Sequence, residues 1–205
     1  MHALQRMQVE VSITVLPSEV ADPIQFPDDR THDTYDAERA AQFYLVLSMV
    51  NVVMKEHRAR FRGRTTPVQF FWGTFDLALT RYSGRPAEPP PGAGLIARVG
   101  GYAEAISAGW WPGDERIPYP AFFAYGHPPP DNIGHVSIEP SGARWNSTAG
   151  EFLLPCDAAR VAADPRQAIV DFLNSTYRRA AKLLAWDSEL TRVIAPNTFD
   201  WSMKS

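Results

Sequence analysis

Two segments carry apolar residues at the three- and four-residue spacing of an amphipathic helix. The first is predicted to begin after Asp36 and to run to about Phe61, and its apolar stripe consists of Phe43, Leu47, Val50, Met54 and Phe61. The second begins at Asp164-Pro165, a capping residue followed by a proline suited to the first helical position. It continues to about Trp186. The pattern therefore predicts two long helices far apart in the chain.

The remaining patterned segments alternate apolar and polar residues, which is typical of strands. We expect strands at 8–16, 68–72, 74–82, 102–111 and 121–125, and two or three more between 134 and 154. Gly73 lies between the second and the third of these, and it suggests a bulge or bend in one long strand.

The order of elements is strand, long helix, several strands, long helix. Connections between the central strands are too short for parallel crossovers, so neighbouring strands should be antiparallel. The expected fold class is α+β, a mainly antiparallel sheet with two long helices packed on it. We expect a single domain over residues 1–195 and a C-terminal tail at 196–205.

Composition narrows the function classes. The chain has 205 residues, a formal net charge of -3 and a pI of about 5.9, which argues against a nucleic-acid partner. With Cys156 as the single cysteine, neither an internal disulfide nor a cysteine zinc site can form. No apolar run is long enough for a membrane span and no secretory signal is visible, so we expect a cytoplasmic protein without a membrane partner.

The segment from Phe70 to Arg85 is the most informative, because it sets charged residues among large aromatic rings in a strand-like stretch. It forms either a ligand-site wall, with Trp72 and Tyr82 stacking on a ligand, or a packed sheet face whose charges are paired structurally; the second interpretation is favoured. By the two-residue period, Asp76 and Arg81 should point to opposite faces.

Two more residues are candidates for chemistry. Glu104 lies in a strand of small and aromatic residues, so it could act as a general acid or base, although a salt bridge to Arg81 or Arg85 is favoured. His32 could shuttle a proton or bind a metal, although capping bonds in a polar helix lead-in are favoured. Neither metal-site spacings nor nucleotide loops are present, so we expect neither metal nor cofactor.

Four segments together resemble an uncharacterised bacterial family of unknown function. They are DRxHxxYD at 29–36, FFWGTFDLALTRYSGR at 70–85, the segment ExxSAGWWPG at 104–113, and GEFLLP at 150–155. The resemblance implies no activity. It does imply that the chain lacks the family's N-terminal region, which would leave a sheet edge or apolar face uncovered and favour a homodimer. The resemblance also implies that members of the family carry a histidine beside the strand glutamate, at the position where this chain has Ala103.

Two hypotheses for function remain open. The leading one is a small-molecule-binding protein, or an enzyme of unidentified reaction, with an aromatic-walled polar pocket for a small anionic or polar ligand. Its acid–base candidates are Glu104 and Asp76, and its ligand-binding candidates are Trp72, Arg81, Tyr82, Arg85, His32 and Trp111. The alternative is a non-catalytic interaction module in which the charged residues form buried ion pairs.

Overall fold

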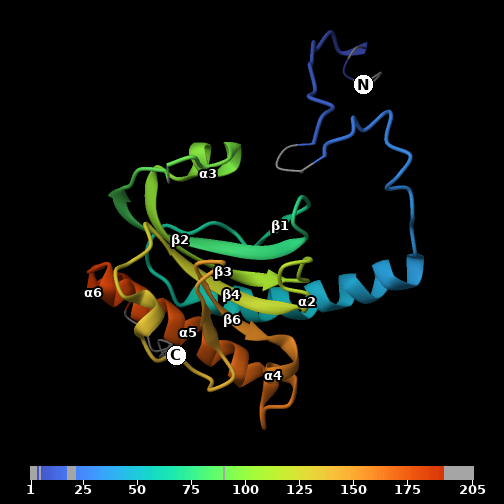
Figure 1. The fold of residues 1–205 in the computed structure, drawn as a ribbon. Helices are drawn as coiled ribbons and strands as arrows, with labels where there is room; N and C mark the ends of the chain where they lie inside the picture. Colours follow the sequence, from blue (N-terminus) through green and yellow to red (C-terminus); the bar gives the residue numbers. More distant parts are fainter. Residues whose placement is uncertain (1–3, 5, 18–21, 90, 192–205) are drawn as a thin grey trace, which may run out of the picture.

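The protein is built on a six-stranded antiparallel sheet with the strand order β1-β2-β3-β4-β6-β5 (Figure 1). The computed structural model describes residues 4, 6–17, 22–89 and 91–191. Helices α2 and α5 lie side by side beneath one face of the sheet, while the opposite face carries no long helix among the described residues. This arrangement confirms the expected α+β class.

The elements have the following bounds. The strands are β1 (Gln69–Phe71), β2 (Asp76–Pro86), β3 (Ala103–Trp111), β4 (Ala121–His127), β5 (Arg144–Asn146) and β6 (Glu151–Pro155). The helices are α2 (Ala37–Ala59), α3 (Leu95–Gly100), α4 (Cys156–Arg160), α5 (Pro165–Leu183) and α6 (Ser188–Thr191), with a 3-10 turn at Ile133–His135.

Both long helices begin where their capping residues predict. The Asp36 carboxylate accepts hydrogen bonds from the backbone N–H groups of Glu38 and Arg39 at the start of α2. The Asp164 carboxylate accepts from the N–H of Gln167 at the start of α5. These bonds satisfy N–H groups that have no partner within the helix, which is why aspartate favours this position.

The main core lies between the sheet and the two long helices. It includes Leu79 of β2, Trp110 of β3, Leu154 of β6, Met54 of α2 and Phe172 of α5. A smaller cluster lies on the opposite face, where Ile117 of the β3–β4 loop covers Ala78, Phe123 and Leu153. Strand residues therefore alternate between a face covered by helices and an open face that is covered only in part by a loop.

The prediction that Gly73 bends one long strand was wrong. Gln69 to Phe71 pairs with Asp76 to Ala78 in an antiparallel hairpin, so the chain reverses through residues 72–75. Phe75 takes a positive φ of 58° in this turn. Aromatic residues stand on both sides of the reversal, and this is why the pattern resembled one interrupted strand.

The predicted strand at 8–16 is also not formed. Residues 9–15 belong to no strand, and their alternating apolar side chains are exposed, with 60% of Ile13 accessible to solvent. A two-residue period indicates that one side of a segment suits burial, but a strand also needs a partner for its backbone. In the described part of the chain this segment is paired with no strand of the sheet.

The predicted limit of the domain at residue 195 and the tail at 196–205 lie outside the described residues. Within the described part, no helix combines the length and the apolar character needed to cross a membrane.

Candidate functional site

A row of polar side chains crosses the open face of the sheet. Thr80 of β2 pairs with Ser107 of β3, which pairs with Tyr125 of β4. Ala124 pairs with Phe152, and this register places Glu151 of β6 beside Tyr125. Because side chains directly opposite each other on antiparallel strands lie close together, four strands contribute neighbouring polar groups to this row.

Hydrogen bonds join members of this row. The hydroxyl oxygens of Thr80 and Ser107 lie 2.8 Å apart, and the Tyr125 hydroxyl is hydrogen-bonded to Ser107. Ser107 itself is buried. Polar groups inside a sheet face are costly unless they are paired, and here the pairing is internal to the row. The row is therefore a preformed surface of hydrogen-bonding groups.

Two carboxylates on this face have perturbed pKa values. Burial raises the pKa of Glu151 to about 7. The positive charge of Arg116 opposes this shift, and the negative charge of Asp76 adds to it. Loss of solvent also raises the pKa of Asp76, opposed by a hydrogen bond from the Thr74 hydroxyl. Like charges that lie close together in a partly desolvated site resist simultaneous ionisation.

Aromatic rings flank the polar row. The rings of Phe123 and Tyr125 stack with their centroids 6.2 Å apart. A Cβ at Gly109 would come within 2.8 Å of the Phe123 ring and closer still to the backbone of β2, so only glycine lets the ring settle on β3. Tyr82 and Trp111 lie on the same face at either side of the row.

Among the predicted site residues, Asp76, Tyr82 and Trp111 share this face. Residues of the row that sequence reasoning missed are Thr80, Ser107, Tyr125 and Glu151. Glu151 stands at the start of a short apolar strand, where a single carboxylate gave no spacing signal. Its one cue was its place in the GEFLLP segment that carries the family resemblance.

Arg81 lies on the opposite, helix-covered face, as the two-residue period predicts. Its guanidinium is 4.2 Å from the Tyr177 ring centroid and 5.1 Å from that of Phe61, and it donates to the backbone oxygen of His57. Burial lowers the pKa of Arg81 to about 10. Its contacts within the described chain are aromatic rings and a carbonyl, so its geometry fits the structural interpretation rather than a ligand contact.

Glu104 and Arg85 form the ion pair that was the favoured interpretation. Arg85 Nη2 lies 2.7 Å from Glu104 Oε1, and the same guanidinium donates to the backbone oxygen of Leu184 at the end of α5. The Glu104 side chain is 12% exposed, whereas that of Arg85 is 48% exposed. The pair therefore ties the end of β2 to β3 and to α5, away from the polar row.

We expect Glu104→Gln to lower the free energy of unfolding by about 1 kcal/mol, because the Arg85 end of the pair is half-exposed to solvent and glutamine keeps one acceptor. Urea denaturation at neutral pH measures this difference. Asp157→Asn, which weakens an exposed pair with Arg160, serves as the matched control and should cost less. A loss of several kcal/mol in Glu104→Gln would instead indicate a deeply buried pair.

Trp72 and His32 lie apart from the polar row. Trp72 is 64% exposed in the β1–β2 turn and contacts the ring of Phe26. His32 is bonded to Asp29 through its ring Nδ1 and its backbone N–H, a local turn of the kind expected of a helix lead-in. Within the described ranges, no group of histidine, cysteine and carboxylate side chains could hold a metal ion.

The fold and site together define an α+β protein with a partly polar open sheet face. Residues 1–193 match the model of a family of unknown function, DUF5996, and the chain belongs to that family. This confirms the membership of an uncharacterised family that the four segments indicated. No curated protein and no solved structure matches the chain. Three of the four segments contribute a side chain to the open face, namely Asp76, Ser107 and Glu151.

Proposed function

We propose that the open face of the sheet binds a small polar ligand, and that Glu151 exchanges a proton with it. The polar row carries this proposal, because four strands bring Thr80, Ser107, Tyr125 and Glu151 into one hydrogen-bonding surface beside Asp76. Polar groups that converge beside a carboxylate of perturbed pKa are typical of binding and catalytic sites. The proposal makes Glu151 the acid–base candidate in place of Glu104.

Acid–base work near neutral pH needs a group that is present in both protonation states. A carboxyl with a pKa of about 7 meets this condition, whereas an ordinary glutamate is almost wholly ionised. Glu151 would donate a proton in its neutral form and accept one in its ionised form. Burial raises the pKa of Glu151, and the negative charge of Asp76, the second carboxylate on the same face, adds to this shift.

The charges of this face favour a ligand that carries a basic nitrogen over the anionic ligand first expected. Two carboxylates face the site, while Arg81 is buried on the other side of the sheet and Arg85 is bound to Glu104. Arg116 reaches the rim, but its guanidinium is paired with Asp114 at 2.7 Å. A bound cation would compensate the charge of Asp76 and Glu151 and lower both pKa values.

The test is thermal unfolding of the protein against separate panels of small amines, neutral polyols and carboxylates at pH 5.5 and 8.0. A ligand of the native state raises Tm by mass action. We expect amines to give the largest shift, and the shift to be larger at pH 8.0, where Glu151 is ionised. Isothermal titration with the best amine should show proton release near pH 7, because binding lowers the pKa of Glu151.

Two variants and one control make the result specific. Glu151→Gln and Ser107→Ala should each remove most of the amine shift, whereas Glu88→Gln, an exposed carboxylate in the loop after β2, should keep it. Equal shifts in Glu151→Gln and Glu88→Gln would contradict the proposal. So would a response confined to carboxylates.

A further inference from the structure

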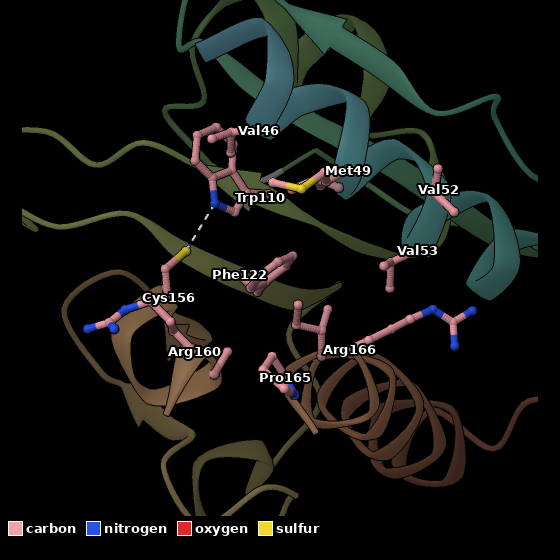
Figure 2. A pocket seen from close by; sticks show the side chains of 13 residues that line it. Val46, Met49, Val52, Val53, Trp110, Phe122, Cys156, Arg160, Pro165 and Arg166 are labelled. Atoms are coloured by element: carbon pink, nitrogen blue, oxygen red, sulfur yellow. Dashed lines mark hydrogen bonds between the residues drawn. The ribbon is translucent and has the colours of Figure 1, made fainter. Parts of the chain in front are cut away.

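A groove of about 530 Å³ opens on the helical side of the molecule, between α2, α4 and α5 (Figure 2). Its floor is formed by Trp110 of β3 and Phe122 of β4, which are buried members of the main core. Met49 and Val52 of α2 stand at its side and remain exposed. This volume lies in the range of ordinary small-molecule sites.

The lining of the groove is almost wholly apolar. Valines of α2 face Ile169 of α5 and Ala159 of α4 across it. The thiol of Cys156 accepts a hydrogen bond from Trp110 Nε1 at 3.1 Å, and burial raises the pKa of this thiol. The cysteine is therefore an uncharged, weakly polar part of the wall. A ligand of this groove needs a flexible hydrocarbon body rather than a polar ring.

Positive charge gathers at one end of the groove. Arg166, in the first turn of α5, and Arg60, just after α2, both contact the single carboxylate of Glu56. Two guanidinium groups thus share one counter-ion and leave a net positive charge beside Val52 and Val53. At the other end, Arg160 is matched one to one with Asp157, so this pair adds no excess charge. Figure 2 shows the side chains of Arg160 and Arg166 at opposite ends.

We propose that this groove binds a free fatty acid of medium chain length, with its carboxylate at the Arg166 end. The hydrocarbon chain would replace water along the exposed side chains of α2 and above Phe122, which is favourable in proportion to the apolar area covered. The carboxylate would neutralise the excess positive charge of Arg60 and Arg166. Arginine binds carboxylates well because its planar guanidinium presents two parallel donors. This site is separate from the open face of the sheet and does not depend on the function proposed there.

The apolar character of α2 agrees with this proposal. A helix that packs on a core by one face normally presents polar residues on the other. Helix α2 buries Val50 and Met54, yet Met49 and Val52 beside the groove are 67% and 62% exposed. A hydrocarbon chain lying along the groove would cover these two residues together.

The probes are dodecanoate, dodecanol and dodecyltrimethylammonium, each used below its critical micelle concentration in isothermal titration with the full chain. We expect dodecanoate to bind with one-to-one stoichiometry, dodecanol to bind about tenfold more weakly, and the cationic amphiphile to bind least. Arg166→Gln should lower the affinity for dodecanoate to that for dodecanol and leave dodecanol unchanged. Arg160→Gln is the matched control and should alter neither.

Met49→Glu tests the groove itself, because it adds a carboxylate at an exposed position on the groove wall. It should abolish dodecanoate binding, whereas Leu45→Glu should not, since Leu45 is exposed on the same helix outside the groove. Circular dichroism and Tm show that both variants fold. The proposal is overturned if dodecanoate fails to bind, if both variants bind it equally, or if dodecyltrimethylammonium binds as well as dodecanoate. It is overturned too if sedimentation shows a dimer that Met49→Glu dissociates, because the groove then belongs to a second copy of the chain.

Discussion

Arg81→Ala should lower the free energy of unfolding by about 3–4 kcal/mol, the largest effect expected of a single polar residue here. The guanidinium fills the space between the rings of Tyr177 and Phe61 under the sheet, and its removal leaves a cavity there. The variant also takes the hydrogen-bond donor from the carbonyl of His57. Urea denaturation, with the m value compared between proteins, measures the loss.

Arg81→Met separates the effect of volume from that of charge. Methionine fills most of the same space and carries no charge that must be buried. We therefore expect the free energy of unfolding of this variant to lie within about 1 kcal/mol of that of the parent protein. The Nε–H of Arg81 has no hydrogen-bond partner in the described part of the chain, which adds to the cost of the native residue. If methionine were as harmful as alanine, the loss would come from the missing charge and the missing hydrogen bond to His57 rather than from the cavity.

Glu151→Gln should raise stability at pH 8 by about 1–2 kcal/mol and leave it almost unchanged at pH 5. The pKa of Glu151 rises from 4.5 to about 7 on folding, so between these values the folded protein holds more protons than the unfolded chain. Stability therefore falls as the pH rises through this window, and glutamine removes the fall. A tenfold change in proton affinity is worth about 1.4 kcal/mol, and the partly solvated position of Glu151 reduces the full value.

The measurement is the difference in unfolding free energy between variant and parent at pH 5, 6, 7 and 8. Burial lowers the pKa of His57 well below 6.5, and this also makes stability depend on pH, but it does so equally in both proteins and cancels in the difference. Glu88→Gln, which changes an exposed carboxylate, is the matched control for this comparison. If the difference in unfolding free energy between Glu151→Gln and the parent did not change with pH, burial would not have raised the pKa of Glu151 in the parent.

Much of the fold was predictable because its signals are local. Asp36 and Asp164 cap helices through bonds to the next few residues, and the stripes that follow are repeated over several turns. The opposite orientation of Asp76 and Arg81 required only the two-residue period of a strand. The strand predicted at 8–16 failed because pairing depends on a partner elsewhere, which a local pattern does not contain.

The candidate site was harder to predict for the same reason. Ser107 and Glu151 become neighbours of Tyr125 only through the registers of β3 with β4 and of β4 with β6. Strand register is set by turns and by core packing, so one residue of slip would move Glu151 to the opposite face. Asp76, Tyr82 and Trp111 could be found because they lie in long, regular strands with aromatic neighbours.

The three hydroxyl groups of the polar row have a directional consequence. Each hydroxyl holds one proton, so if Tyr125 donates to Ser107, then Ser107 donates to Thr80. In the reverse order, Thr80 donates to Ser107 and Ser107 donates to Tyr125, with the same number of hydrogen bonds. A ligand that donates to the Tyr125 oxygen selects the first order, and one that accepts from Tyr125 selects the second. The occupant beside β4 would thereby set the direction of a dipole on β2, two strands away, without any movement of the backbone.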